Sequence, residues 1–266
     1  MVELNETRLN EYRDFANELA DLARQIIVPY FRDHLTVDNK PTSSPSGQPV
    51  TEADLETEAA MRKMISKHYP YHGIIGEEFA PTNPDSDLCW VLDPIDGTKA
   101  FIAGLPMFGT LIGLGLKGNP ILGVLEQPIL QDRFIGTKGG TFLNGVAINT
   151  RKCPNLMDAV YSMTDPRMMS GDIQQGILQK LMKAARITQF GGNCYAYGML
   201  ASGSIDLITE NDLMPWDIFA LIPIIEGAGG VVTSWSGDAT KTASHVIACG
   251  DQQLHTEVLK LLRTAI

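Results

Sequence analysis

The segment from Trp90 to Thr98, WVLDPIDGT, constrains the fold of this chain most strongly. Its apolar start predicts a buried strand, and two acids follow three positions apart, at Asp93 and Asp96. Because proline cannot continue a sheet ladder and glycine permits a tight turn, we expect the strand to end here in a rigid turn. Mg²⁺ prefers oxygen ligands, often one or two carboxylates. The turn is thus a candidate metal site, or an ordinary Asp-Pro and Asp-Gly turn.

Two further acidic segments could complete such a site. Glu77 and Glu78 follow a short apolar pair and precede Asp93 closely in the sequence. A glutamate pair at a strand end is usually solvated, but an adjacent strand would bring Glu77 beside Asp93. Asp217 follows Trp216 at the expected start of a helix, where an acid also stabilises the helix dipole. On these residues alone, both the metal-binding and the ordinary interpretations stay open.

Taken together and in order, these segments resemble the inositol monophosphatase family of metal-dependent phosphatases. The family pattern is G-E-E, then W-x-x-D-P-[IL]-D-G-T, then W-D before a helix that ends in G-A-G-G. This chain carries the four segments at 76–78, 90–98, 216–217 and 227–230. It is most similar to the histidinol-phosphatase branch, through residues 97–101, 108–112, 191–198 and 220–227. That branch typically has Asp where this chain has Asn193.

The resemblance implies an α/β fold, the layered α–β–α–β–α sandwich of the inositol monophosphatase/fructose-1,6-bisphosphatase type. The residue pattern agrees with two halves. Residues 1–150 predict helices on an antiparallel sheet, which would carry most metal ligands. Residues 151–266 predict an α/β half, which would carry Asp217 and the substrate pocket. The resemblance further implies a homodimer that binds two or three Mg²⁺ ions.

The implied reaction is hydrolysis of a small-molecule phosphomonoester. The resemblance implies that Mg²⁺ is held by Glu77, Asp93, the backbone carbonyl of Ile95, Asp96 and Asp217. Asp93 would bridge two ions, because one carboxylate has two oxygens. Two metal ions about 4 Å apart can neutralise a phosphate, activate a water and stabilise the leaving oxygen.

Catalytic roles are implied for Asp54, Glu77 and Thr98, of which Asp54 and Thr98 would orient the attacking water. The backbone N–H groups of Gly97 and Thr98 would bind phosphate oxygens. On the sequence alone, Asp54 is equally well a surface acid early in its helix. Lys40 is either a solvated lysine or a residue that places its loop near the site.

The substrate pocket is expected to involve Asn193 and Glu210. Histidinol carries an ammonium and an imidazole, and a carboxylate at Glu210 would pair with either cation. Glu210 could equally accept hydrogen bonds from inositol, and Asn193 could be a plain turn residue. The favoured function is Mg²⁺-dependent hydrolysis of histidinol phosphate to histidinol and phosphate. The alternatives are an inositol or sugar-phosphate phosphatase and, in another class, a non-catalytic metal-dependent binding protein.

Composition restricts the partners and the compartment. The net charge of −10 disfavours nucleic acid and anionic membrane surfaces, and it would attract metal ions and cationic metabolites. The four cysteines show no close pairing, and the acidic N-terminus is unlike a signal peptide. These features predict a reduced, cytoplasmic enzyme, with a plastid form that has lost its transit peptide as the alternative.

Apolar periodicity predicts the main elements. Helices are expected near 9–31, 52–69, 172–185 and 251–263, with a further helix that starts at Asp217 and contains Pro223. Strands are expected through 74–148, with an antiparallel meander over 110–116, 120–125 and 133–136, and again at 159–163, 205–208 and 231–232. Residues 37–50 are rich in Pro, Ser and Gly, so we expect a mobile loop there.

Overall fold

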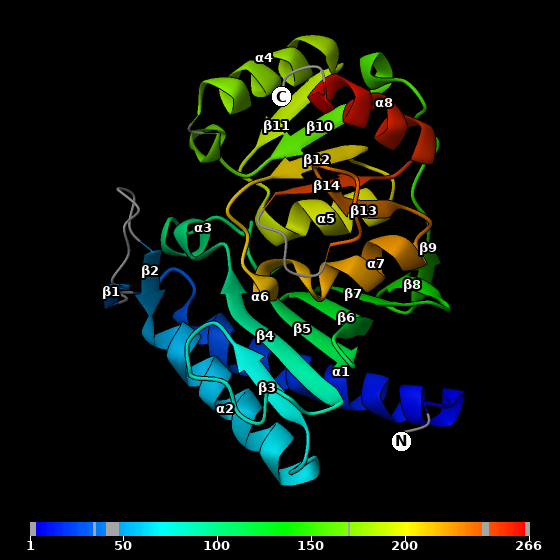
Figure 1. The fold of residues 1–266 in the computed structure, drawn as a ribbon. Helices are drawn as coiled ribbons and strands as arrows, with labels where there is room; N and C mark the ends of the chain where they lie inside the picture. The colour runs from blue at the N-terminus through cyan, green and yellow to red at the C-terminus, as the bar shows by residue number, and fades with distance from the viewer. Residues whose placement is uncertain (1–3, 34–35, 41–47, 170, 241–244, 264–266) are drawn as a thin grey trace.

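The structure is a computed structural model that describes residues 4–33, 36–40, 48–169, 171–240 and 245–263. Its elements stack in alternating layers of helix and sheet, from α1 and α2 at the foot of Figure 1 to α4 and α8 at its top. The predicted α–β–α–β–α sandwich is therefore confirmed. The helices are α1 (Glu6–Tyr30), α2 (Glu52–His68), α3 (Thr98–Ile102), α4 (Asp172–Ala184), α5 (Asn193–Ala201), α6 (Pro215–Ile218), α7 (Leu221–Gly227) and α8 (Gln252–Arg263).

The outer helices α1 and α2 cover one face of the first sheet. In α1, the side chains of Phe15, Leu19 and Ile27 are buried, as their near-helical spacing predicts. The helix begins where the Asn5 side chain accepts a hydrogen bond from the backbone N–H of Arg8, at 2.9 Å. Both predicted helices are thus confirmed, and together with the sheet they enclose the first hydrophobic core.

Within the described residues, the first sheet has seven strands in sequential order. They are β3 (Gly73–Gly76), β4 (Leu88–Asp96), β5 (Gly109–Leu116), β6 (Asn119–Gln127), β7 (Asp132–Thr137), β8 (Gly140–Leu143) and β9 (Val146–Ile148). The antiparallel meander predicted over 110–136 is confirmed in β5, β6 and β7, and the antiparallel order extends from β4 to β9. The expectation of a wholly antiparallel sheet in residues 1–150 is wrong at β3, which pairs with β4 in parallel because residues 77–87 cross over between them.

The second sheet has five strands among the described residues, in the order β11-β10-β12-β14-β13. They are β10 (Val160–Met163), β11 (Ile187–Phe190), β12 (Leu207–Glu210), β13 (Val231–Ser234) and β14 (Val246–Cys249). The first three are mutually parallel, and β14 pairs antiparallel with both neighbours. The two sheets draw on residues 73–148 and 160–249, and the domain division near residue 150 stays a prediction.

The prediction of a mobile loop over 37–50 is wrong for the residues at its two ends. Strand β1 (Val37–Lys40) pairs antiparallel with β2 (Gln48–Thr51), so these residues form a two-stranded ribbon. Backbone hydrogen bonds between the strands outweigh the loop-forming composition of this segment. Residues 41–47 lie outside the described residues, and so does the side chain of Lys40.

The prediction of a single helix from Asp217 is also wrong. The segment forms two helices, α6 and α7, which are separated at Phe219 and Ala220. Pro223 therefore lies in the first turn of α7 rather than in a helix interior. Backbone N–H groups in a first turn have no partner within the helix, so the missing N–H of proline is tolerated there. The break accounts for a proline that would otherwise bend the helix.

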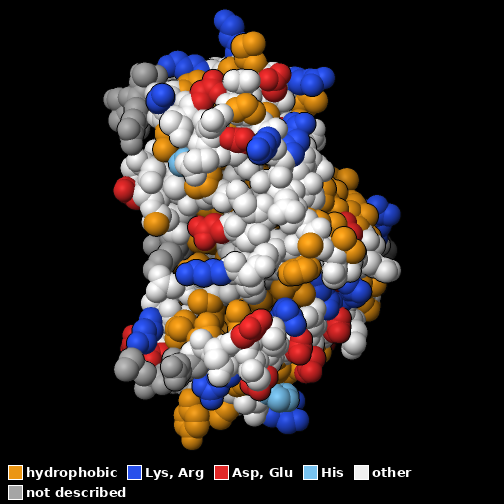
Figure 2. Space-filling model, turned by 90° about the vertical axis from the view of Figure 1, so that its right-hand side faces the viewer, with side chains coloured by type: hydrophobic (Ala, Val, Ile, Leu, Met, Phe, Trp, Pro, Cys, Tyr) orange, Lys and Arg blue, Asp and Glu red, His pale blue; other side chains and the backbone are white. Residues whose placement is uncertain are grey.

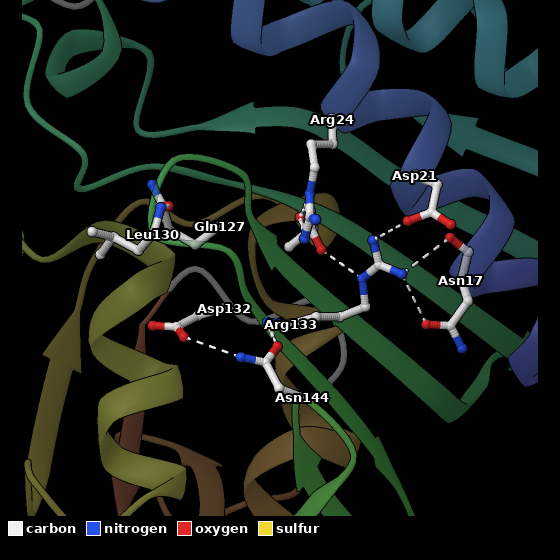
Figure 3. A network of polar contacts seen from close by, with 9 residues as sticks. Asn17, Asp21, Arg24, Gln127, Leu130, Asp132, Arg133 and Asn144 are labelled. Carbon is white, nitrogen blue, oxygen red and sulfur yellow. Dashed lines mark hydrogen bonds and ion pairs between the residues drawn. The ribbon is translucent and has the colours of Figure 1, made fainter.

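A buried ion-pair network ties α1 to the first sheet (Figure 3). Glu126 on β6 is fully buried, and it accepts hydrogen bonds from Arg133 at 2.6 Å and from Arg24 at 2.5 Å. Arg133 also contacts Asp21 at 2.6 Å and the side-chain oxygen of Asn17 at 3.0 Å, both on α1. Because every charge in this network has a partner, α1 is held to the sheet at low electrostatic cost.

The molecular surface mixes charges of both signs. On the face in Figure 2, acidic side chains are interspersed with lysine and arginine, and hydrophobic side chains form smaller groups between them. On this face, therefore, neither sign of charge is gathered into one patch. As far as the described residues extend, no helix has the length and apolar character needed to cross a bilayer.

We predict that Arg133→Met lowers the free energy of unfolding by about 2–3 kcal/mol, because it leaves the buried Glu126 with one cation. Urea denaturation measures the loss. The matched control is Arg13→Met, since Arg13 is half-exposed and lies 3.9 Å from an exposed Asp14. It should change stability by no more than about 0.5 kcal/mol. Equal losses in both variants would contradict a special role for the network.

Candidate active site

The predicted turn after Trp90 is instead an irregular continuation of strand β4. The strand runs to Asp96, and its pairing with β5 shifts between Asp93 and Asp96. Thr110 fixes this irregularity by donating a hydrogen bond to the Pro94 carbonyl at 2.8 Å. In a regular strand, residues three apart point to opposite faces. The extra residue of the bulge lets both carboxylates serve one site, and it accommodates a proline without an N–H.

The turn itself follows at Gly97, whose φ of 92° lies in the left-handed region. Glycine adopts this conformation without strain, and it directs the chain into the short helix α3. Thr98 is the first residue of α3, and its hydroxyl donates to the Ile95 carbonyl at 3.1 Å. Ile95, Gly97 and Thr98, which are predicted to surround the phosphate and one metal, are thus held together by local hydrogen bonds.

Glu77 leaves the end of β3, beside β4. Its backbone N–H donates to the carbonyl of Leu92 at 3.3 Å, one residue before Asp93. The expectation that an adjacent strand brings Glu77 alongside Asp93 is correct. Glu78 is half-buried, and its backbone N–H donates to the Glu58 carboxylate at 2.7 Å.

Glu58, which the sequence reasoning missed, holds this segment in place. It is fully buried on α2, and it also accepts hydrogen bonds from Arg62 at 2.7 Å and from the backbone N–H of Phe79 at 3.3 Å. A Cβ on Gly76 would lie 2.2 Å from the Glu58 carboxylate, so a larger residue there would displace this carboxylate. The position of Glu58 could have predicted its burial, because it lies four residues after Asp54, on the helix face that also buries Met61.

Asp54 lies in the first turn of α2, and it is buried rather than solvated. Its Oδ2 accepts hydrogen bonds from the backbone N–H and the hydroxyl of Thr51, at 2.8 and 2.6 Å. The interpretation of Asp54 as a surface acid is therefore wrong. The predicted helix start at Thr51 is correct, and the cap fixes the orientation of the carboxylate.

Asp217 reaches the site from the middle layer, at the third residue of α6. Its Oδ2 accepts a hydrogen bond from the backbone N–H of Met214 at 2.7 Å, so the helix-capping interpretation is correct. A carboxylate has about four acceptor positions, so capping and metal binding are compatible. The position of α6 in turn depends on how closely the following residues approach the first sheet.

That approach is made possible by a row of glycines across β5, β6 and β7. Gly113 pairs with Gly123, and Gly123 pairs with Gly136. A Cβ on Gly123 would lie 1.8 Å from the Ala220 carbonyl oxygen, and one on Gly136 would lie 2.3 Å from the Ile224 Cα. The backbone of the α6–α7 segment therefore rests directly on the sheet, and this contact sets the position of Asp217.

The N-terminus of α5 closes the site from the second half of the chain. Asn193 has a φ of 44°, a conformation that Asn tolerates better than most residues. Its side-chain amide donates to the Met107 carbonyl at 2.6 Å, across from Gly97. Asn193 is thus the first residue of α5 rather than a plain turn residue. Cys194 follows. Burial and the neighbouring Asp217 and Glu77 carboxylates raise the pKa of Asp96 well above its ordinary value, and a backbone hydrogen bond from Cys194 offsets only part of this rise.

Glu210 is the last residue of β12, and it is buried. Its Oε1 accepts a hydrogen bond from the backbone N–H of Thr164 at 2.8 Å. Burial is the main reason that the pKa of Glu210 rises to about 7, while the Thr164 hydrogen bond lowers it and Asp217 raises it. The structure thus places Glu210 at the rim of the same group of acids.

The electrostatics of these residues centre on Asp93. Burial raises its pKa well above the ordinary value, and four neighbouring carboxylates raise it further, those of Glu77, Asp96, Asp217 and Asp54. The Oδ1 atom of Asp93 is buried and has no hydrogen-bond partner in the part of the chain that the structure describes. A group of acids that destabilise one another in this way is what a bound divalent cation would compensate.

These carboxylates do not form a finished ligand set. Within the described ranges, no three acidic, histidine or cysteine side chains converge closely enough to hold an ion as they stand. The caps at Asp54 and Asp217 direct one oxygen of each carboxylate to the backbone. The residues nevertheless fit a hard cation, because the donors are oxygens and the buried Asp93 oxygen lacks a partner.

The comparisons with known proteins agree with this architecture. An inositol monophosphatase from Zymomonas mobilis superposes with a TM-score of 0.85 at 40% identity, covering 96% of this chain and 98% of that one. The sequence profile of the inositol monophosphatase family matches residues 8–266. The chain therefore belongs to the inositol monophosphatase family, and it is a phosphatase.

Two relatives are similar over most of their length. The bifunctional phosphatase IMPL2, chloroplastic, of Arabidopsis thaliana is 42% identical over 98% of this chain and 77% of the relative. A histidinol-phosphatase of Chlorobaculum parvum is 33% identical over 84% of this chain and 85% of the relative. The family predicted from the four segments is thus confirmed.

We predict that Gly123→Ala displaces the α6–α7 segment, because its methyl group cannot share space with the Ala220 carbonyl. Stability should fall by about 1–3 kcal/mol, and phosphatase activity should fall more than stability explains. The control is Gly176→Ala in α4, where nothing lies within 4 Å of the added Cβ. It should raise stability by about 0.5–1 kcal/mol and leave turnover unchanged. Full activity of folded Gly123→Ala would contradict the proposed positioning of Asp217.

Proposed function

We propose that the protein is a Mg²⁺-dependent phosphomonoesterase that hydrolyses histidinol phosphate to histidinol and phosphate. The observation that carries the metal dependence is the buried Asp93 carboxylate, which lacks a partner on Oδ1 and is surrounded by four further acids. Such a site is unfavourable without a cation and becomes favourable with one. Phosphomonoesters are themselves anionic, so a neutralising ion would also admit the substrate.

The proposed ligands of two or three Mg²⁺ ions are Glu77, Asp93, the carbonyl of Ile95, Asp96 and Asp217. The strand irregularity at Pro94 supports this set, because it lets Asp93 and Asp96 face one site. When bound, Mg²⁺ would neutralise the phosphate charge and increase the acidity of the attacking water.

The remaining site residues would orient the reactants. Asp54 is fixed by its hydrogen bonds to Thr51, and Thr98 by its bond to the Ile95 carbonyl. Both would orient the attacking water toward phosphorus, with Glu77 beside them. The backbone N–H groups of Gly97 and Thr98 would donate to the phosphate oxygens, which the left-handed conformation of Gly97 supports.

The choice of histidinol phosphate rests on the pocket beyond the phosphate. Glu210 is a buried hydrogen-bond acceptor, and a cationic leaving alcohol would supply its donor. The Asn193 side chain lies next to Gly97. The histidinol-phosphatase of Chlorobaculum parvum supports this choice. The inositol monophosphatase of Zymomonas mobilis supports the alternative, an inositol or sugar-phosphate phosphatase. A homodimer and a cytoplasmic location stay predictions.

We predict that Asp93→Asn lowers kcat/KM by about three orders of magnitude, because this carboxylate would bridge two ions. Saturating Mg²⁺ should raise the melting temperature of the wild type by mass action, and this shift should disappear in Asp93→Asn. Asp85→Asn, at an exposed loop position, is the matched control and should retain both properties. Full activity of the wild type in chelator would contradict the mechanism.

We predict that the wild type hydrolyses histidinol phosphate with a higher kcat/KM than inositol 1-phosphate. Glu210→Gln should reduce the histidinol phosphate value about tenfold more than the inositol 1-phosphate value, because a charge-assisted hydrogen bond is lost. Glu226→Gln, at an exposed position of α7, is the control for the same chemical change. Equal or reversed preference in the wild type would favour the alternative substrate class.

A further inference from the structure

Three buried polar atoms on α5 and on the second sheet have no hydrogen-bond partner among the residues that the structure describes. They are Ser162 Oγ, Tyr197 Oη and Glu210 Oε2, and we call them the polar triad. The three residues are between 1% and 3% exposed. A buried hydroxyl or carboxylate oxygen without a partner is destabilising, so such atoms call for a ligand or an internal water.

The two sheet residues of the triad point to the same side. Ser162 on β10 pairs with Ile208 on β12, and Glu210 follows Ile208 two residues later. Because side chains alternate along a strand, these three share one face. Tyr161 and Thr209 take the opposite face, where their hydroxyls bond to each other at 2.7 Å. Ile208 packs in the middle-layer core with α5, so Ser162 and Glu210 also face α5.

Tyr197 approaches the same place from α5. A Cβ built on Gly192, next to the start of α5, would lie 3.5 Å from Ser162 Oγ, so Ser162 lies at the N-terminal end of this helix. Side chains in a helix lean toward its N-terminus, which directs the Tyr197 ring back toward Ser162. Burial raises the pKa of Tyr197, and among charged groups Glu210 is the first contributor, followed by Asp96 and Asp217. The triad therefore borders the acid cluster.

We propose that Ser162 and Tyr197 join Glu210 in binding a primary ammonium group on the leaving alcohol, so that the site selects phosphate esters of amino alcohols. An ammonium has three donors and no acceptor, and the triad offers three acceptor atoms, one of them on a carboxylate. Ser162 and Tyr197 would then be specificity-determining residues for the reaction. This inference rests on the proposed function, since it concerns the leaving group of the same substrate.

The test compares two esters that differ only in the amine, histidinol phosphate and 3-(imidazol-4-yl)propyl phosphate. The wild type should prefer the amine-bearing ester at least tenfold in kcat/KM. Tyr197→Phe should reduce that preference about tenfold, and Ser162→Ala should reduce it in the same direction. Without substrate, the melting temperature of Tyr197→Phe should equal or exceed that of the wild type, because the lost hydroxyl had no partner.

Tyr195→Phe, two residues earlier in α5, is the matched control. Its hydroxyl donates to Asp132 at 2.7 Å, outside the triad. This variant should lose stability and keep the wild-type preference between the two esters. The opposite pattern, a lower melting temperature and an unchanged preference in Tyr197→Phe, would show that an internal water satisfies the triad, and it would overturn the proposal.

Failure of the proposed function is distinguishable from failure of this inference. A wild type that hydrolyses inositol 1-phosphate better than histidinol phosphate would contradict the proposed function. The inference about the triad is overturned separately, if the amine brings no preference between the two imidazole esters, or if Tyr197→Phe and Ser162→Ala both retain that preference.

Discussion

The close contact between the α6–α7 backbone and the first sheet is the constraint on which the rest of the site depends. The glycine row at Gly113, Gly123 and Gly136 removes three side chains, so that a helix start can rest on strands β5 to β7. Any side chain there would move the middle layer outward and carry Asp217 away from Asp93. The break between α6 and α7 at Phe219 and Ala220 contributes to this contact, because it lets the backbone pack against the glycines before α7 begins.

A second consequence of this packing is that several carboxylates lie close together away from solvent. Asp93 is buried among acids that raise its pKa, whereas the buried Glu126 has cationic partners at Arg24 and Arg133. The contrast is between a carboxylate that is paired within the fold and one whose charge no cation in the described residues matches. Where the fold requires only stability, each buried charge is matched. In the proposed site, the acids lack such partners, and a bound cation would match them; strongly shifted pKa values often have this origin.

The loops that carry the site are held by residues that do not take part in the proposed chemistry. Glu58 receives the backbone of the Glu77–Glu78 segment, Thr110 fixes the carbonyl of Pro94, and Thr51 orients Asp54. Each of these contacts joins the site to a helix or strand whose own core is well packed. These site residues are therefore positioned by α2, β2 and β5, although they lie far apart in the chain.

The sequence by itself determined the family, the long helices and the acids of the candidate site. These features are local, since helical periodicity, the Thr51 cap and the segment from Trp90 to Thr98 are each written in neighbouring residues. Only the tertiary structure decided that β3 is parallel to β4, that Pro94 sits in a strand irregularity, and that 37–40 and 48–51 pair as a ribbon. It also decided the burial of Glu58 and Tyr197. The reason is physical: strand pairing, backbone contact across a glycine row and the loss of solvent around a side chain all depend on residues that are distant in the chain, and local sequence carries no record of which distant residues will meet.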